Sequence, residues 1–467
     1  MKITTHPRPH IEEVVAYIML KEAGEKFFPG ISQVEGLTFI NPAARNCNGN
    51  KAEAAGEIMV GVGHGRFDEH PAIGEPRKDG ECAATLVAKH LGIIDDPVWQ
   101  RLIKFVTIND LKGQGSPFDI GYLPKIMYPS ESVETSVTVE TVVDWISVAV
   151  RAIYASEKKS FETKTPFDPQ AGISVFDRIF AAWIQGKCGE EIPNGEIVDF
   201  VFESKELNAE ETIKHFGMDE DPAMEMILRF FKAQPKADNL FDLKGIPALI
   251  CALNPDDAGL AIDWLLMALD AKYNEQIRFI QAGLEYEEKA ELAEVAGFNG
   301  KPLKIAVVDN CDNPLMNKYA RSEGIGLIIQ RQEWGNTQIY INKKFRFLKI
   351  YDLAAMIRLA EQEAQGKVET KDWRKLREEG VVKGCENWYF HHEGQMLLNG
   401  SLTTEQPPTR LALREILRLA TVALNPEFPP GKAEYCSKGI CTNPCSMYKW
   451  GLRKCVEARK EAGKPKN

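Results

Sequence analysis

The sequence predicts an α/β protein with an N-terminal parallel sheet and flanking helices, a helical middle, a second, smaller α/β domain and a cysteine-rich tail. Strand and helix patterns alternate in the first 110 residues, as in parallel strands joined by crossover helices. Apolar residues then recur at helical spacing from about 139 to 296, and alternation resumes after residue 301. We expect no internal repeats or low-complexity tracts.

The first domain is expected to span residues 1–296, with a core at 1–130 and a helical extension at 131–296. The predicted core elements are a strand at 2–5, a helix at 12–25, a strand at 57–61, a helix at 82–91 and a strand at 102–108. Gly92 is a typical C-cap residue for the second of these helices.

Helical spacing continues through the extension, and a Gly- and Pro-containing segment at 297–302 marks the expected boundary. The predicted helices of the extension lie at 142–154, 175–184, 223–231, 261–269 and 273–296. The second domain is expected at 301–424, with strands at 303–308, 326–330 and 338–342 and helices at 353–364 and 411–423.

Composition limits the classes of function. A chain of 467 residues with 44% hydrophobic and 27% charged residues is typical of a multidomain globular protein. The sequence contains no apolar run long enough for a membrane span and no secretory signal pattern, which predicts a cytoplasmic protein. A net charge of −10 argues against a protein that binds nucleic acid over its whole surface.

The charge is nevertheless uneven. Residues 431–467 carry nine Lys and Arg against three Glu, which is +6, so the rest of the chain is −16. This tail is suited either to attracting a polyanion or simply to remaining solvated, and the sequence favours neither.

Metal-ligating residue types gather at the expected strand ends. His6, His10 and Glu12 form an HxxxHxE pattern after the first strand. The remaining members of the set follow the second and third strands: Asp68, Glu69, His70 and Asp110. Imidazoles and carboxylates suit one or two Mn²⁺ or Mg²⁺ ions. Any one of these residues alone is more commonly a surface carboxylate or a hydrogen-bonded histidine, but the chemistry of α/β folds lies at the carboxyl ends of strands.

Two of these ligand motifs, together with a small-residue segment that follows them, resemble motifs of the DHH phosphoesterase superfamily. Within it they are most similar to the branch typified by the melanocyte-proliferating-gene proteins, which resemble RNA exonucleases. The similar segments are Thr5-His6-xxx-His10-Ile-Glu12-Glu13, Arg66-Phe67-Asp68-Glu69-His70 and Cys82-Ala83-Ala84. The resemblance implies that His6, His10, Glu12, Glu69 and Asp110 bind metal. It further implies that Asp68 orients the site or ligates, and that His70 binds the scissile phosphate or acts as an acid.

The match departs from the family at three positions. Glu12 stands for an aspartate and Glu69 for the central histidine. The strand-two aspartate that bridges two ions in the family is Gly61 here. His64 or Glu57 are candidate replacements, and the glycines at 61, 63 and 65 are alternatively suited to a close backbone approach to phosphate.

A weaker resemblance extends to the second domain. It rests on Trp373, Gly380, the run Trp388-Tyr-Phe-His391-His392-Glu-Gly394 and the segment Leu398-Asn399-Gly400-Ser401. The resemblance implies a substrate-binding half in which His391, His392, Asn399 and Gly400 contact a phosphate or a 3′ end. An aromatic-rich strand with one histidine buried against Trp388 is an equally good reading.

Four cysteines form a second metal motif in the tail. The spacing Cys436-x4-Cys441-x3-Cys445-x9-Cys455 supplies enough thiolates for tetrahedral zinc, or for an iron–sulfur cluster. Between the last two cysteines, Tyr448 and Trp450 lie beside Arg453 and Lys454. Aromatic and basic side chains together favour binding of single-stranded nucleic acid.

These features predict a metal-dependent phosphoesterase, most simply an exonuclease that acts on single-stranded RNA or an oligonucleotide. One alternative is a degenerate member that binds nucleotides or RNA without cleavage, which the glycine at position 61 favours. Another is a small-molecule phosphatase or pyrophosphatase, which would have no clear use for the basic tail. The sequence does not specify an oligomeric state.

Overall fold

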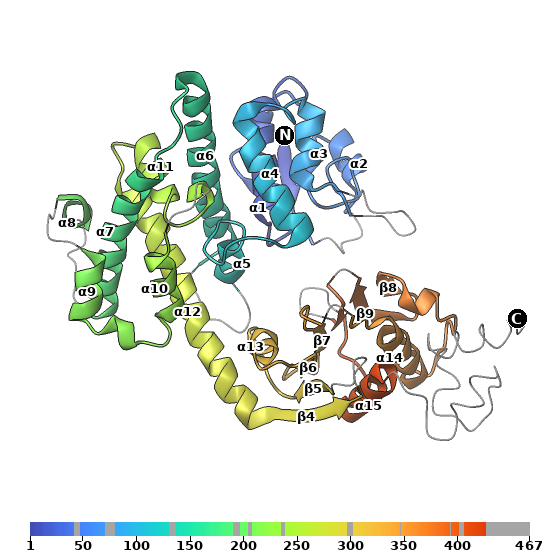
Figure 1. The fold of residues 1–467 in the computed structure, drawn as a ribbon. Helices are drawn as coiled ribbons and strands as arrows, with labels where there is room; N and C mark the ends of the chain where they lie inside the picture. Colours follow the sequence, from blue (N-terminus) through green and yellow to red (C-terminus); the bar gives the residue numbers. More distant parts are fainter. Residues whose placement is uncertain are drawn as a thin grey trace, which may run out of the picture. The chain divides into compact units, whose positions relative to one another are not determined.

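The computed structural model describes residues 1–41, 47–70, 80–129, 137–189, 197–203, 208–234, 239–296, 302–345, 347–392, 394–400 and 406–425. The fold is α/β, and the chain divides into two compact units, Met1–Ile277 and Arg278–Asn467 (Figure 1). Over these described ranges, no helix is both long and apolar enough to cross a membrane. The four tail cysteines predicted to bind metal lie outside the described residues.

The first unit contains a small parallel sheet. Its strands are β1 (Lys2–Thr5), β2 (Leu37–Phe39) and β3 (Glu57–Met59), in the order β2-β1-β3. Both neighbours run parallel to β1, with Ile3 aligned to Leu37 on one side and to Ile58 on the other. The chain crosses from one side of β1 to the other between β2 and β3. Such a switch point opens a crevice at the carboxyl ends of the strands.

Helices cover one face of this sheet. They include α1 (Ile11–Ala23) and α3 (Ala83–Leu91), which pack on each other, while α2 (Gly49–Ala54) precedes β3. Ile3 and Ile58 are buried in the same core as Val14 and Ile18 of α1. Every residue of α1 from Ile11 to Leu20 is buried, because α3, α4 (Pro97–Lys112) and α6 (Val139–Thr163) all contact this helix.

The strand predicted at 102–108 is wrong, because these residues lie within α4. Asp96 caps this helix by accepting a hydrogen bond from Val98 N at 2.9 Å, and Pro97 occupies the first turn. Leu102, Ile103 and Val106 are buried at helical spacing. The β-branched and aromatic content of this segment had favoured a strand, but the caps and the spacing decide for a helix. Asp110 therefore approaches the site from the last turn of a helix.

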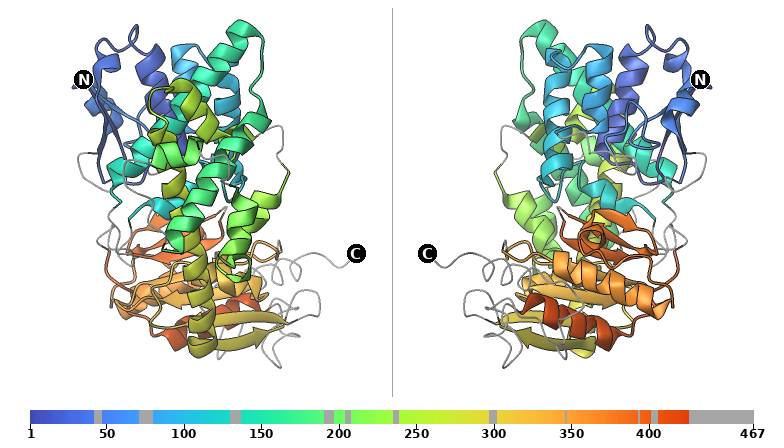
Figure 2. Two further views of the ribbon diagram at one scale, coloured as in Figure 1. Left: turned by 90° about the vertical axis from the view of Figure 1, so that its left-hand side faces the viewer. Right: turned by 90° about the vertical axis from the view of Figure 1, so that its right-hand side faces the viewer.

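The helices predicted at 142–154, 175–184, 223–231 and 261–269 are confirmed, but the first is longer and ends at Thr163, and the last forms one continuous helix with the segment predicted as a separate helix from residue 273. The remaining helices of the first unit are α5 (Leu123–Met127), α7 (Pro169–Lys187), α8 (Ile197–Glu203), α9 (Ala209–His215), α10 (Glu225–Lys232), α11 (Ile246–Leu253) and the first part of α12 (Gly259–Lys289). Helix α6 contacts α1, α4 and α11, while α7 contacts α9 and α11 (Figure 2). Short 3-10 turns occupy Ile31–Gln33, Met218–Glu220, Asn239–Phe241 and Lys375–Arg377.

The second unit is a mixed sheet with helices on both faces. Its strands are β4 (Ala290–Val295), β5 (Leu303–Val308), β6 (Leu327–Arg331), β7 (Thr337–Ile341), β8 (Gly380–Val382), β9 (Cys385–His391) and β10 (Met396–Asn399), in the order β4-β5-β6-β7-β10-β9-β8. Only the pair of β5 and β6 is parallel among these described strands. The helices are α13 (Met316–Ser322), α14 (Tyr351–Ala364) and α15 (Leu413–Leu424).

Alternate residues of β5 face the two helical layers. Ile305 and Val307 belong to the core shared with α14 and α15, whereas Ala306 and Val308 pack with residues of α13 and α12. This period of two is expected for a strand covered on both faces. The three strands and two helices predicted for this domain are confirmed.

The break between the units lies inside α12, earlier in the chain than the predicted boundary at 297–302. The helix ends at Lys289 instead of running to Ala296, and β4 follows at once. Residues 290–295 pair antiparallel with β5, and this pairing overrides a local preference for helix. Phe279 also packs on Tyr319 of α13, with ring centroids 5.4 Å apart, so the end of α12 belongs with the second unit.

Arg358 in α14 is predicted to dominate the stability of the second unit. Its side chain is fully buried and donates hydrogen bonds to the carbonyls of Leu376, Glu378, Gly380 and Trp388. Replacement by Met leaves these buried acceptors without their donor, so we expect Arg358→Met to destabilise the unit by at least about 3 kcal/mol. Hydrogen exchange of β9 amides under native conditions measures this loss.

The control is Arg418→Met in α15. Arg418 pairs with Glu415 on the same helix, and 49% of its side chain is exposed. An exposed ion pair of this kind contributes less than about 1 kcal/mol. Equal effects of the two substitutions would contradict a structural role for the buried guanidinium.

Asp242, before α11, is predicted to make stability depend on pH. Burial raises the pKa of Asp242 to about 6, against an ordinary value of about 3.9. The folded state therefore holds this proton more tightly than the unfolded state, and its stabilising effect is lost as pH rises from about 4 to about 6. Asn does not titrate. As pH rises over this interval, the free energy of unfolding of Asp242→Asn should therefore increase by up to about 2 kcal/mol relative to that of the parent protein.

The measurement is the difference in unfolding free energy between the two proteins at pH 4.5 and at pH 7.5. Asp219→Asn, the same substitution at an exposed position, is the control for the loss of a carboxylate that is not buried. A constant difference for Asp242→Asn would show that the Asp242 carboxyl does not retain its proton in the folded state.

Candidate metal centre

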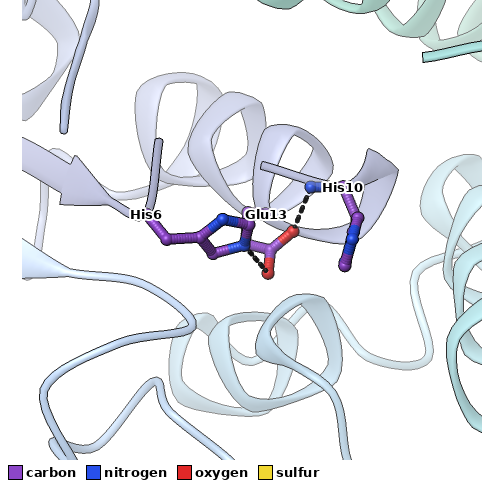
Figure 3. Close-up of side chains that lie close together, drawn as sticks. All are labelled: His6, His10 and Glu13. Atoms are coloured by element: carbon purple, nitrogen blue, oxygen red, sulfur yellow. Dashed lines mark hydrogen bonds and ion pairs between the residues drawn. The ribbon is translucent and has the colours of Figure 1, made fainter. Parts of the chain in front are cut away.

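The turn after β1 brings two imidazoles and a carboxylate together. His10 is the N-cap residue of α1, and its backbone N–H donates to Glu13 Oε2 at 2.7 Å. His6 Nε2 lies 3.1 Å from Glu13 Oε1. Figure 3 shows the Glu13 carboxylate between the His6 ring and the start of the helix. A glutamate at the third helical position reaches back in this way in a capping box, so helix capping itself places the carboxylate beside both histidines.

The electrostatics of this turn favour cation binding. Burial alone would raise the pKa of Glu13, but the hydrogen bond with His6 and the charges of His10 and His6 outweigh it and lower the pKa to about 2. The carboxylate is therefore ionised at neutral pH. The surrounding protein desolvates His10 and lowers its pKa, although its side chain keeps access to solvent. A neutral imidazole is the form that binds metals.

Glu12 connects this turn to the start of α3. Its carboxylate is 2% exposed, and Oε2 accepts a hydrogen bond from Ala83 N at 2.8 Å. Burial, with the nearby charges of Glu13 and Glu69, raises the pKa of Glu12. One ligand atom from each of His10, Glu12 and Asp110 falls within 4.8 Å of the others. The last turn of α4 thus contributes its aspartate to the same region.

The loop after β3 supplies a further ligand group. Asp68 is buried and accepts hydrogen bonds from the backbone N–H groups of His64 at 2.7 Å and His70 at 3.0 Å. Its Oδ1 also lies 2.9 Å from His70 Nδ1, and Glu69 Oε1 lies 3.4 Å from the same nitrogen. Burial would raise the pKa of Asp68, but these contacts lower it. Burial raises the pKa of Glu69 to about 7.

The three groups form one electrostatic cluster. His10 is shared by the first two, and the charges of Glu13 and Glu69 both act on Glu12. Several carboxylates are thus buried close together, which is costly unless a cation or protons compensate their charge. Imidazole nitrogens and carboxylate oxygens are suitable ligands for Mn²⁺ or Mg²⁺, so this donor set fits a hard divalent cation.

Glu13 is the candidate ligand that the sequence pattern missed. Gly61, at the place of the strand-two aspartate, has a φ of +65°. A Cβ at this position would lie 2.8 Å from Glu13 Oε1 and 2.9 Å from Glu13 Cγ. The Glu13 side chain therefore occupies the space next to position 61 and brings a carboxylate there from α1.

The two replacements suggested by sequence fit less well. Glu57 begins β3, at the opposite end of that strand from Gly61, and accepts a hydrogen bond from Thr4 Oγ1 at 2.5 Å. His64 lies closer to the site, but its ring nitrogen Nδ1 lies 3.3 Å from His70 O and 3.8 Å from Asp68 Oδ2. The carboxylate nearest position 61 is that of Glu13.

The candidate substrate residues of the second unit are engaged within that unit. Asn399 is fully buried, its Oδ1 accepting from Thr409 N at 2.8 Å and its Nδ2 donating to Asn387 O at 2.9 Å. Gly400 has a φ of +53°, and a Cβ there would lie 2.8 Å from Gln406 O. Packing thus accounts for the Asn-Gly pair.

The two histidines of β9 and the following turn also have local partners. His391 Nδ1 accepts from Gly394 N at 3.0 Å, and His392 Nε2 lies 2.8 Å from Arg377 O. The His392 ring packs edge-on against the rings of Tyr351 and Phe390, whereas Trp388 Nε1 donates to Glu361. Both histidines remain partly accessible to solvent.

No family model, curated protein or solved structure matches this chain. The chemistry of the centre therefore follows from its own geometry.

Proposed function

We propose that this protein is a metal-dependent phosphoesterase of the DHH type that hydrolyses phosphodiester bonds in single-stranded RNA or a short oligonucleotide. The convergence of three ligand groups next to the carboxyl ends of β1 and β3 supports this proposal. In the proposed centre, Mn²⁺ or Mg²⁺ is held by His6, His10, Glu12, Glu13, Glu69 and Asp110. A bound divalent cation supplies charge neutralisation of the phosphate and activation of water.

The protein's own groups have separable roles in this proposal. Asp68 holds His70 through Nδ1, so the other ring nitrogen is the one assigned to the phosphate or the leaving oxygen. The His70 side chain is 54% exposed, as an acid that meets substrate must be. Lys125 is exposed, and its positive charge is close enough to His10 to affect the pKa of that imidazole. A positive charge at this place suits attraction of a substrate phosphate.

The observation that favours hydrolysis is the Glu13 carboxylate beside Gly61. It supplies a negative oxygen where the family pattern has an aspartate. The competing proposal, a member that binds nucleotides or RNA without cleavage, rests on the glycine itself, since a ligand reaching from α1 need not bridge two ions.

Incubation with Mn²⁺ and end-labelled single-stranded RNA tests both. The exonuclease proposal predicts release of mononucleotides, lost in a His10→Ala, Glu12→Ala variant that remains folded. Intact RNA that is nevertheless retained by the protein would favour the binding-only alternative. Hydrolysis of pyrophosphate or a simple phosphate monoester, with RNA untouched and unbound, would favour a small-molecule phosphatase.

The tail motif belongs to the same proposal. Cys436, Cys441, Cys445 and Cys455 are proposed to bind zinc, or an iron–sulfur cluster, next to a basic segment that contacts the nucleic acid. Metal analysis of the full chain and of a Cys436→Ser, Cys441→Ser variant separates zinc from iron. Retention of the same metal content by the variant would exclude these thiolates as its ligands.

A further inference from the structure

The helical part of the first unit contains two segments with matching sequence. Lys89-His-Leu-Gly92 followed by Asp96-Pro97 matches Lys214-His-Phe-Gly217 followed by Asp221-Pro222. Further along come Phe118-Asp119-Ile-Gly-Tyr-Leu-Pro124 and Phe241-Asp242-Leu-Lys-Gly-Ile-Pro247, then Val143-Asp144-Trp145 and Ile262-Asp263-Trp264. The three matches occur in the same order, which corrects the expectation of a chain without repeats.

The matched residues adopt the same local structure. Gly92 and Gly217 follow α3 and α9 with φ values of 73° and 64°, as left-handed residues that end helices. Asp96 Oδ1 accepts from Val98 N at 2.9 Å, and Asp221 Oδ1 accepts from Ala223 N at 2.8 Å. The two copies therefore share the left-handed glycine after the helix and the aspartate that accepts from the backbone amide two residues later.

The two Phe-Asp loops are alike in the same way. Asp119 Oδ1 accepts from Gly121 N at 3.0 Å, and Asp242 Oδ1 accepts from Lys244 N at 2.9 Å. A proline in the first turn then opens α5 in one copy and α11 in the other.

Contacts between the copies are reciprocal. Ile120 N donates to Phe241 O at 3.1 Å, and the matched Leu243 N donates to Phe118 O at 3.3 Å. Phe105 stacks on Phe241 at 4.3 Å between centroids, and the matched pair of Phe230 and Phe118 stacks at 4.0 Å. When residue i of one copy contacts residue j of the other and the reverse also holds, the copies are related by a local twofold axis.

The two tryptophans lie on this axis. Their rings stack at 4.3 Å with an interplanar angle of 6°. Trp145 Nε1 donates to Trp264 O at 2.8 Å, and Trp264 Nε1 donates to Trp145 O at 2.9 Å. Two residues that each donate the same hydrogen bond to the other are expected where equivalent positions of the two copies meet at the axis.

The match extends to α1 and α7. Glu12 accepts from Ala83 N at the start of α3, and Asp177 in α7 accepts from Ala209 N at the start of α9, one residue beyond the position that the Lys-His motifs align with Ala83. Counting from these carboxylates, Val175 and Arg178 stand where His10 and Glu13 stand in the first copy. The described residues between α7 and α9 form only α8, where the first copy has β2, α2 and β3.

We infer that the first unit contains one helical unit twice, related by a local twofold axis, and that the second copy, without the ligand set, positions the segment of the first copy that borders the metal centre. This segment is residues 116–128. Tyr128 OH donates to Pro9 O in the turn between the two proposed histidine ligands, and the positive charge of Lys125 contributes to the lowered pKa of His10. The inference gives the helical middle a role, and its positioning part rests on the proposed function.

The test compares two aspartates of the second copy in the full chain. Asp242 supports the loop that pairs with residues 118–120, whereas Asp221 accepts hydrogen bonds from Ala223 N, in the turn before α10, and from Tyr273 OH. Asp242→Ala should speed hydrogen exchange at the Ile120 amide at least about tenfold and weaken Mn²⁺ binding about three- to tenfold by calorimetry. Asp221→Ala should change neither, although it also removes an aspartate that accepts from a backbone amide two residues later.

Reciprocity gives the duplication a test of its own. Asp119→Ala in the first copy should speed exchange at the Leu243 amide, mirroring the effect of Asp242→Ala on Ile120. Phe241→Leu, which keeps apolar volume but loses the stacked ring, serves if Asp242→Ala does not fold, and should act on Ile120 in the same direction.

The possible outcomes separate the two proposals. Unchanged hydrogen exchange at the Ile120 amide in both Asp242→Ala and Phe241→Leu would overturn the inference, whether or not the protein binds metal. Faster exchange with unaltered Mn²⁺ affinity would overturn the positioning role. If the parent protein binds no Mn²⁺, the proposed function fails, while the exchange results still decide the duplication.

Discussion

Replacement of Glu13 by Gln is expected to weaken Mn²⁺ binding by at least about 30-fold and to abolish phosphodiester hydrolysis. Gln keeps the length of the side chain and an oxygen that accepts from His10 N. The change removes the negative charge that sits between His6 and the start of α1. Calorimetric titration with Mn²⁺ measures the affinity, and mononucleotide release from single-stranded RNA measures the activity.

Glu22→Gln is the matched control, because Glu22 lies on the same helix and is exposed. It should bind Mn²⁺ like the parent protein. Should Glu13→Gln also bind like the parent while remaining folded, the ligand set would have to be built from Glu12 and the Asp68 loop instead. A variant that binds Mn²⁺ normally but no longer cleaves would place Glu13 in catalysis without metal ligation.

The choice between Glu12 and Glu13 illustrates what the sequence could not decide. Both residues lie in the first turn of a predicted helix, about 100° apart around its axis, so only one of the two carboxylates is directed toward His6. The phase of the helix relative to His6 depends on the turn at Pro7 and Pro9, which no periodicity specifies. In the structure Glu12 faces the start of α3 and Glu13 faces His6.

The elements themselves were more predictable where local signals agree. In the second unit, the strand at 303–308 is bounded as predicted because its apolar run follows directly after Pro302. The strand prediction at 102–108 is wrong because the composition of this segment favours a strand, while the residues that cap it, Asp96 and Gly113, favour a helix. Caps are decisive in such a conflict, since they satisfy backbone groups that composition ignores.

The duplication shows a different limit. The two copies share few identical residues, spread over segments of unequal length, because the first copy contains the strands and the ligand loop between α1 and α3. Only the reciprocal stacking and hydrogen bonds, such as those of Trp145 and Trp264, single out which matches are structural. Most candidate ligands of the proposed metal centre, by contrast, could be selected from the sequence because they follow β1 and β3 along the chain, whereas Asp110 comes from α4 and Glu13 was not selected.

Substitution of Gly61 by Ala is expected to disrupt the metal centre from a position that contributes no ligand. Its φ of +65° makes an alanine there cost about 1 to 2 kcal/mol, and the new Cβ would lie within 3 Å of the Glu13 side chain. Backbone and helix both hold their places, so the Glu13 carboxylate has to move. We expect Mn²⁺ affinity to fall at least about tenfold, measured by calorimetric titration.

Gly56→Ala separates this displacement from backbone strain. Gly56 precedes the same strand, has a φ of +82°, and a Cβ there would have nothing within 4 Å. Both substitutions therefore carry a similar conformational cost, but only the one at position 61 reaches Glu13. Equal losses of Mn²⁺ affinity would trace the effect to stability, and unaltered affinity in both would show that the Glu13 carboxylate is not needed beside Gly61. A selective loss in Gly61→Ala would instead tie the ligand set to the carboxylate that α1 delivers beside Gly61.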